Sequence, residues 1–497
     1  MCGIIGIITR DDVPNFKKST STLNHRGPDS SGIFEENGVH FGHCRLSILD
    51  LSEQGSQPMF SSDQRYVLIY NGEVYNHLDI RKILSEKRDL SFLSHTDTAT
   101  VLEGFATLGE SILPMLNGMF AFGIYDRQEQ QVWVARGPVG IKPLYYYWDG
   151  QKFAFASEIK ALLSFDSLNL ELYPEAFANY LHFLWSPGER TPFRHIKRLL
   201  PGHFLRIDLR DPQLTPQVKM FYQIPFNGAY DTATESEWVD RLEKHLLEAV
   251  ERQLLSDVPV GFFLSGGLDS SLLVAMARRL HPEQKIQCFT IDTSVMADAE
   301  EGFVSDLGYA QMVAEHLEVP LEVVAAYDDY LPYFDKVIWQ LDEPQADPAP
   351  INVLKICERA REMGYKVLIS GAGGDDMFSG YRRHQALRYD FVFRFIPKWI
   401  SRPLQLTLTQ FLPFHPLSRR IQKFLDGAGR SARSRMVHYF SWLGMDRVRQ
   451  LFTPGVLPAH FDPDEVLAAV LDGIPKESSP LNQMLYLEMR SFLPDHN

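Results

Sequence analysis

In the middle of the chain the sequence runs Val258-Pro-Val-Gly-Phe-Phe-Leu264, then Ser265-Gly266-Gly267-Leu268-Asp269-Ser270-Ser271, then Leu272-Leu-Val-Ala-Met-Ala-Arg-Arg-Leu280. The first run has the length and apolar composition of a strand that is covered on both faces. The last run has the apolar spacing of a helix and ends on basic residues. The sequence therefore predicts a buried strand, a tight glycine turn and a helix.

The predicted turn suits a phosphate group. Paired glycines let the backbone approach an anion closely, and the N–H groups at the helix start donate to it together with the hydroxyls of Ser265, Ser270 and Ser271. A Walker-type loop would end in a lysine, whereas this loop carries Asp269, which suits a Mg²⁺ ion bridging phosphate oxygens. The alternative is that the glycine pair forms only a turn.

The composition is that of an ordinary globular protein. The 497 residues are enough for about two to four domains, and 45% are hydrophobic and 23% charged. A net charge of -14 argues against nucleic acid as the main partner. The scattered Cys2, Cys44, Cys288 and Cys357 give neither zinc spacings nor a disulfide framework, which fits a reducing cytoplasm. We expect no signal peptide and no membrane span.

The chain begins Met1-Cys2-Gly3-Ile4, a short run of strand-forming residues. Cys2 is small enough for methionine removal, which would give it a free α-amine. That amine, with a reference pKa near about 8, can accept the thiol proton at neutral pH. Cys2 is therefore a candidate nucleophile, although an early cysteine can also be a plain buried residue.

Four further segments have the chemistry of an amide-binding pocket. His25-Arg26-Gly27-Pro28-Asp29-Ser30 is a rigid turn flanked by charges, and the fork of Arg45 can hold a carboxylate. A strand from residue 66 breaks at Asn71-Gly72, whose amide and N–H can stabilise an oxyanion. Asp97 lies at a predicted helix start, where it either faces the pocket or caps the helix.

These motifs resemble the glutaminase domain of glutamine-hydrolysing asparagine synthetases. The resemblance rests on Met1 to Ile4, His25 to Asp29, Arg45-Leu46-Ser47-Ile48 and Asn71 to Asn76, and it extends to about residue 205. It implies an N-terminal nucleophile αββα sandwich. It also implies that Cys2 attacks glutamine and that Asn71 and Gly72 stabilise the oxyanion. In the same way, Arg45 would bind the substrate carboxylate, and Glu73 and Asp97 would hold its amino end.

From Glu235 onwards, long helical runs alternate with short apolar strands, as in a parallel α/β sheet. A helix is expected over 238–255, and further strands over 285–291 and 366–370. Ligands of such sheets bind beyond the carboxyl ends of the strands. The polar segments expected there are the 265–271 turn, the acidic loop 341–347 and the loop 370–376.

The order of these segments resembles the ATP-pyrophosphatase domain of the same synthetases, a fold of the adenine nucleotide alpha hydrolase type. The resemblance implies that Asp269 and Asp375 hold Mg²⁺ and pyrophosphate. It implies that ATP contacts Leu264, Ser265, Gly266, Gly267, Asp269, Ser270, Ser271, Ser370 and Gly371. Ala372 stands where most of the family carries an acidic residue, and alanine can neither ionise nor donate a hydrogen bond.

We therefore expect a glutamine amidotransferase domain over 2–205, a linker over 206–235 and an asparagine synthetase ATP-pyrophosphatase domain over 236–497. In the family, the segment matching Met484 to Asn497 continues further and supplies a catalytic lysine, so the second domain is expected to be incomplete. Residues 381–435 are basic and aromatic. Amphipathic helices packed on the sheet are favoured there over a membrane or polyanion surface.

Three functions are consistent with the sequence. The first is a cytoplasmic asparagine synthetase, with a homodimer as its candidate assembly, that uses glutamine, ATP with Mg²⁺, and aspartate. The second, motivated by Ala372, is an amidotransferase of the same class that acts on another carboxylate, such as a sugar acid or a peptide. The third is a glutaminase joined to a nucleotide-binding module that performs no synthesis.

Overall fold

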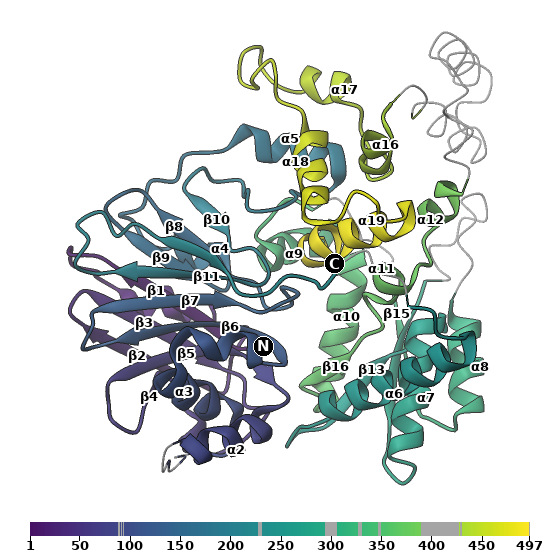
Figure 1. Ribbon diagram of the computed structural model, residues 1–497, viewed down its shortest axis with the longest axis horizontal. Coiled ribbons are helices and arrows are strands. Elements are labelled where there is room, and N and C mark those ends of the chain that lie inside the picture. Colours follow the sequence, from purple (N-terminus) through teal and green to yellow (C-terminus); the bar gives the residue numbers. More distant parts are fainter. Residues whose placement is uncertain are drawn as a thin grey trace.

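The computed structural model describes residues 1–87, 90, 92, 94–226, 231–293, 306–326, 331–345, 349–388, 427 and 430–496. Two antiparallel sheets form the first half, and a parallel sheet flanked by helices forms the second (Figure 1). None of the helices in these ranges combines the length and apolar character that crossing a bilayer requires.

Each sheet of the first half has six strands. In spatial order, the first contains β10 (Ile196–Arg198), β8 (Tyr145–Trp148), β9 (Phe153–Ala156), β1 (Gly3–Ile8), β3 (Val39–Arg45) and β2 (Ser30–Glu36). The second contains β12 (Gln217–Met220), β11 (His203–Asp208), β7 (Gln131–Arg136), β6 (Gly118–Asp126), β5 (Tyr66–Val74) and β4 (Met59–Phe60).

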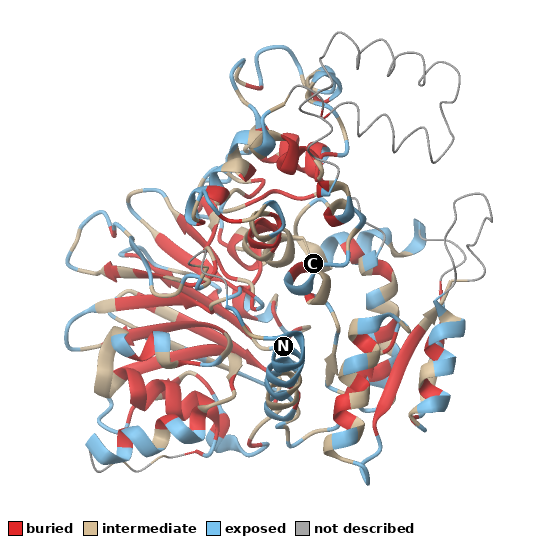
Figure 2. Cartoon of the chain, turned by 45° about the vertical axis from the view of Figure 1, so that its right-hand side comes forward, coloured by how far each residue is buried: buried red, intermediate tan, exposed pale blue. Residues whose placement is uncertain are grey.

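Three apolar layers hold these sheets and their helices together. One lies between the sheets and includes Ile4, Phe41 and Val67. Another packs the first sheet against α1 (Phe16–Ser21) and α4 (Ile159–Leu163), and a third packs the second sheet against α2 (His77–Lys87) and α3 (Asp97–Leu108). β1 is buried at all six positions because both of its faces are covered, as Figure 2 shows for the strands of this half. The predicted αββα sandwich is confirmed.

The parallel sheet has the strand order β15 (Leu321–Ala325), β14 (Gln287–Asp292), β13 (Val260–Phe263) and β16 (Val367–Ile369). One face packs on α6 (Glu235–Gln253), α7 (Leu268–Leu280) and α8 (Leu307–His316), and the other on α10 (Ala349–Glu362). A capping box between Thr234 and Glu237 begins α6. The predicted strand, turn and helix are therefore confirmed as β13, residues 264–267 and α7.

A third body of helices covers the junction of the two halves. It contains α11 (Gly374–Phe378), α12 (Arg382–Leu387), α16 (Ala432–His438), α17 (Met445–Gln450), α18 (Pro463–Ala469), α19 (Pro480–Leu487) and α20 (Leu493–Asp495). α9 (Phe334–Leu341) packs instead on α10, through Val337 and Ile351. Phe183 and Trp185, at and after the end of α5 (Pro174–Phe183), share its core with Met436 and Met484. A segment inside the first 205 residues thus packs with the end of the chain.

The predicted boundary at residue 205 cuts through a strand. β11 runs from His203 to Asp208 and pairs with β12, so residues 206–220 extend the second sheet of the sandwich. Turn residues such as Pro212 and Pro216 in this segment suggested a linker, but they form the turn of a hairpin.

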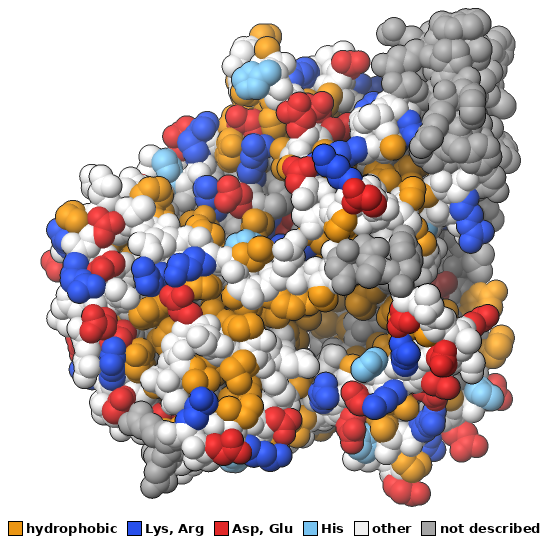
Figure 3. Space-filling view, viewed as in Figure 1, with side chains coloured by type: hydrophobic (Ala, Val, Ile, Leu, Met, Phe, Trp, Pro, Cys, Tyr) orange, Lys and Arg blue, Asp and Glu red, His pale blue; other side chains and the backbone are white. Residues whose placement is uncertain are grey.

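Most of the basic aromatic stretch 381–435 lies outside the described residues. On the face in Figure 3, basic and acidic side chains are interspersed.

Candidate active sites

Cys2 immediately precedes β1, which is hydrogen-bonded between β3 and β9. The N–H of Leu46 points at the Cys2 sulfur, with 3.4 Å between the nitrogen and Sγ. Burial raises the pKa of the Cys2 thiol, and this outweighs the nearby amine and the Leu46 N–H, which lower it. The thiol is therefore protonated at neutral pH and needs a base before it can attack a substrate.

An amine at the chain start is suited to be that base. The amino group of Met1 donates to the Arg26 carbonyl at 3.2 Å, and burial lowers its pKa to about 5. An amine in this environment is uncharged at neutral pH and can accept a proton. The Nε of Arg26 also donates to the Cys2 carbonyl at 2.9 Å, so the His25 to Ser30 turn holds the backbone of Cys2.

Lys142 is a site residue to which the sequence assigned no role. It is buried in the loop between β7 and β8, where burial lowers the pKa of its ammonium group to about 8. Its charge acts on Cys2, whose pKa it lowers, and on Glu73. The signal available in the sequence was a lysine among glycine, proline and apolar residues in Gly140-Ile-Lys-Pro-Leu144.

Asn71 and Gly72 lie within β5, opposite Ala121 and Phe120 of β6, so the predicted break of the strand at this pair is wrong. Asn71 is 1% exposed, and its Nδ2 has no hydrogen-bond partner among the described residues. A buried amide donor without a hydrogen-bond partner costs free energy, and a substrate oxygen that accepts from this donor would remove the cost. At Gly72, a Cβ would lie 2.5 Å from the Met119 carbonyl oxygen, so only glycine fits.

Asp97 is buried at the start of α3, and its carboxylate bonds to β5. Its Oδ2 accepts from the Tyr70 hydroxyl at 2.7 Å and from the Val74 N–H at 2.8 Å. The helix cap is Thr96, whose side chain accepts from the Ala99 N–H, so the alternative that Asp97 caps the helix is wrong. Burial raises the pKa of Asp97, and burial and the charge of Asp97 raise that of Glu73 well above its usual range.

The Arg45 side chain is engaged by its own loop. Its Nη1 donates to the Ser52 carbonyl at 2.8 Å, and its Nη2 contacts the carbonyls of Asp50 and Leu49. Arg45 is 6% exposed. The structure thus shows Arg45 shaping residues 49–52, and its role in binding a substrate carboxylate stays a prediction.

The predicted phosphate loop follows β13. Gly266 has φ +77°, a conformation that favours glycine, and the Gly267 N–H donates to Ser265 Oγ at 3.2 Å. Ser265 and Ser270 share a hydroxyl hydrogen bond of 3.0 Å. Ser271 Oγ is buried without a hydrogen-bond partner among the described residues. Leu264 is buried, so its backbone is the part of it that can face the loop.

The loop after β16 packs directly on this one. A Cβ on Gly371 would lie 2.8 Å from the Ser270 nitrogen, and a Cβ on Gly374 would lie 2.2 Å from Asp269 Oδ2. Burial raises the pKa of Asp269, and the nearby charge of Asp375 raises it further. The two predicted acids are therefore close enough for their charges to repel, and an added cation would relieve this repulsion.

This pair of acids fits Mg²⁺. No group of three or more potential ligand side chains occurs in the described part of the chain. Mg²⁺ is commonly held by one or two carboxylates together with substrate phosphates and water, and two acids beside the predicted phosphate loop match this ligand set.

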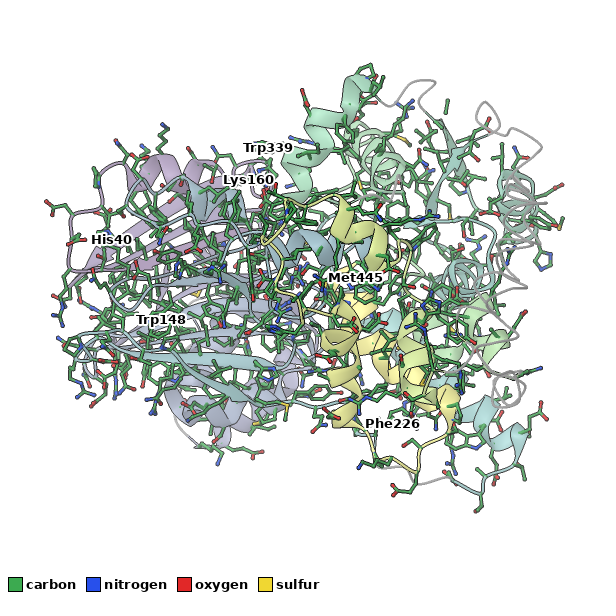
Figure 4. The ribbon with its side chains drawn as sticks, turned by 90° about the horizontal axis from the view of Figure 1, so that it is seen from above. His40, Trp148, Lys160, Phe226, Trp339 and Met445 are labelled. Carbon is green, nitrogen blue, oxygen red and sulfur yellow. The ribbon has the colours of Figure 1, made fainter. Side chains whose placement is uncertain are left out.

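The acidic loop after α9 is predicted to lie among the ligand-binding segments of the parallel sheet, but two of its acids bond to the first half. Asp342 pairs with Lys160 at 2.9 Å, and Glu343 accepts from Arg198 at 2.8 and 3.0 Å. Lys160 and Arg198 both belong to the first half. Figure 4 shows Lys160 beside Trp339, where the halves meet, and its ammonium lies 4.7 Å from the ring centroid. These two acids therefore join the halves.

Glu158 connects this junction to the His25 to Ser30 turn. Burial alone would raise its pKa, but the hydrogen bond from His25 and the charges of Arg26 and Lys160 outweigh burial and lower the pKa to about 2. Arg26 Nη1 lies 2.7 Å from Glu158 Oε1. The chain of ion pairs thus runs from Arg26 through Glu158 and Lys160 to Asp342.

Glu158→Gln is expected to lower the free energy of unfolding by about 3 kcal/mol at pH 7, because the folded state holds this carboxyl well below its usual pKa. Since the folded pKa is depressed, this stabilisation is present above about pH 4.5 and is lost as the pH falls towards 2. Denaturant titrations at pH 7 and pH 3 measure both values.

The matched control for this variant is Glu171→Gln, which removes an ion pair with Arg194 in which both side chains are exposed. Its expected effect is under about 1 kcal/mol. A Glu158→Gln loss that is equally small at pH 7, or that does not shrink towards pH 3, would contradict the assignment.

The comparisons with known proteins agree with this arrangement. Residues 1–218 match the family model described as glutamine amidotransferase domain, and residues 241–497 match the one described as asparagine synthase. A Bacillus subtilis protein named asparagine synthetase (glutamine-hydrolyzing) 1 is 33% identical over 81% of this chain and 62% of its own length.

Two further relatives are about equally similar to this chain, and one of them is named an amidase. A Methanocaldococcus jannaschii protein, provisionally named asparagine synthetase (glutamine-hydrolyzing) 2, is 32% identical over 80% of this chain and 79% of its own length. A Penicillium rubens protein named amidase chyE is 32% identical over 76% of this chain and 56% of its own length. The chain thus spans less than two thirds of two of these three relatives.

Proposed function

Because the chain belongs to the asparagine synthase family and carries a glutamine amidotransferase domain, we propose that it is a glutamine-dependent, ATP-consuming amidotransferase that converts aspartate to asparagine. The observation that carries this proposal is found in the first half, where Cys2, an unpartnered Asn71 amide, the half-buried Glu73 and the buried Asp97 occur together. The other half brings the 265–271 loop against Asp375.

In the first half, removal of Met1 frees the amine of Cys2, which takes the thiol proton. The sulfur attacks the side-chain amide of glutamine, and the Asn71 amide and Gly72 N–H stabilise the oxyanion. Ammonia leaves as the thioester forms, and water then releases glutamate. Glu73 and Asp97 hold the amino end of glutamine, Arg45 holds its carboxylate, and Lys142 stabilises the thiolate.

In the second half, the N–H groups and hydroxyls of residues 265–271, with Ser370 and Gly371, hold the phosphates of ATP. Asp269 and Asp375 would hold Mg²⁺, whose positive charge would offset that of the leaving pyrophosphate. The aspartate β-carboxylate attacks the α-phosphorus to give an acyl-adenylate, and ammonia displaces AMP. The ion pairs of Asp342 and Glu343 keep the two halves together while ammonia passes.

An assay with glutamine, ATP, Mg²⁺ and aspartate tests this proposal. We expect glutamate, asparagine, AMP and pyrophosphate in equal amounts, and no AMP when aspartate is omitted. Glutamate release without AMP or pyrophosphate in the complete mixture would refute the synthetase half of the proposal and leave a glutaminase with a nucleotide-binding module.

A second candidate keeps the reaction and changes the acceptor. Ala372 is exposed in the loop that packs on Asp269, and its methyl group offers no charge or hydrogen bond to an acceptor. The relative named amidase chyE shows that similar chains carry names other than asparagine synthetase. Pyrophosphate release measured across sugar acids, peptides and aspartate separates the two, and aspartate as the sole active acceptor would exclude the second.

A further inference from the structure

A single carboxylate oxygen of Asp97 bonds on both sides of residues 71–73 of β5, the segment proposed to bind the oxyanion. Asp97 Oδ2 accepts from the Tyr70 hydroxyl, just before Asn71, and from the Val74 N–H, just after Glu73. The two donor–acceptor distances are 2.7 and 2.8 Å, and Asp97 is 3% exposed. One buried oxygen thus fixes both ends of the three residues that the proposed chemistry uses.

Tyr70 is held at its backbone as well. Its N–H donates to Gln57 Oε1 at 2.6 Å, and its carbonyl lies 3.1 Å from His43 Nε2. Burial lowers the pKa of His43 to about 4, so at neutral pH the ring is uncharged and its Nε2–H donates to that carbonyl. The peptide that leads into Asn71 therefore has no freedom to rotate without breaking buried hydrogen bonds.

We propose that Tyr70 is a positioning residue for glutamine hydrolysis: through Asp97, its hydroxyl sets the place of the Asn71 amide and the Gly72 N–H. The proposal rests on the proposed glutaminase activity and adds a residue to it. An oxyanion donor acts through its position in the transition state, and a shift of about 1 Å can cost a large part of its effect. Loss of the hydroxyl should therefore reduce kcat by a larger factor than it raises KM for glutamine, since Asp97 also holds the amino end of the substrate.

The same hydrogen bond also sets the charge of Asp97. Burial raises the pKa of Asp97, and the bonds from Tyr70 and Val74 hold it down. Around it lie Glu73 of β5, Tyr75 after that strand and Arg81 of α2, and Glu73 is itself faced by Lys142 and Asp257. Without the Tyr70 hydroxyl, Asp97 would bind a proton at higher pH, so the acid limb of glutaminase activity should move upward.

Tyr70→Phe, assayed as glutaminase in the full chain, tests the proposal. We expect kcat to fall at least about tenfold, KM to rise by a clearly smaller factor, and the acid limb to move to higher pH. Tyr66→Phe is the matched control. It also removes a tyrosine hydroxyl from β5, four residues earlier, and the Tyr66 side chain lies by Asp126 and not by Asp97. Synthesis driven by added ammonia should be unchanged in both variants.

An unchanged kcat, a fall equal to that of Tyr66→Phe, or a rise in KM without loss of kcat would overturn the proposal. Should Tyr70→Phe not fold, Gln57→Met removes the acceptor of the Tyr70 N–H, and the same pattern of kcat and KM is expected; an unchanged kcat there would also overturn it. Absence of glutaminase activity in the unaltered protein would refute the proposed function itself, which separates the two failures.

Discussion

Cys2→Ala is expected to abolish glutamine-dependent amide formation, by at least about a thousandfold, while amide formation from added ammonium chloride continues. The alanine side chain cannot form the thioester, and no neighbouring group replaces the sulfur. The loss should be confined to the first half, because the loops proposed to bind ATP follow strands of a separate sheet. Parallel assays of glutamate, AMP and product with either nitrogen source measure it.

Cys44→Ala is the matched control for this variant. Cys44 is buried on β3 beside Gly3 of β1, and burial raises the pKa of its thiol to about 11, so it is unreactive. Its replacement should affect stability more than the glutaminase rate. Normal glutamine-dependent synthesis by Cys2→Ala would remove Cys2 from the proposed reaction, and loss of ammonia-dependent synthesis as well would indicate a folding defect.

The motifs that the sequence identified are the ones that local physics determines. A strand, two glycines and an apolar helix specify the 264–267 turn without help from the rest of the chain, and the structure confirms it. The same holds for the alternation of strands and helices after Glu235. In the first half, the buried run at β1 indicated only a strand, and the αββα arrangement came from the resemblance to a known family.

Contacts between residues far apart in the chain could not be predicted from the sequence. Asp342 and Glu343 lie in an acidic loop, and nothing local distinguishes an acid that binds a metal from one that pairs with Lys160 or Arg198 about 150 to 180 residues away. Tyr70 was missed for a similar reason. A tyrosine in an apolar strand predicts a core residue. Only the structure shows that the Tyr70 hydroxyl donates a hydrogen bond to Asp97.

Asp269→Asn is expected to lower acceptor-dependent pyrophosphate release at least about a hundredfold, because the site loses one of its two carboxylate charges. Asparagine has nearly the same shape, so the close packing against Gly374 is kept. Since burial and the charge of Asp375 already raise the pKa of Asp269, removing its charge should not reduce stability. Pyrophosphate release and thermal unfolding, measured together, distinguish a stable inactive protein from an unfolded one.

Asp335→Asn separates this effect from a general effect of the helix dipole. Asp335 and Asp269 both lie in the first turn of a helix, α9 and α7 respectively, where an acid contributes about 0.3 to 1 kcal/mol. Asp335 is exposed and far in the sequence from the phosphate loop, so its replacement should leave pyrophosphate release within about twofold of normal. If Asp269→Asn behaved in the same way as Asp335→Asn, the acid of the phosphate loop would be part of a helix terminus and not of a nucleotide site.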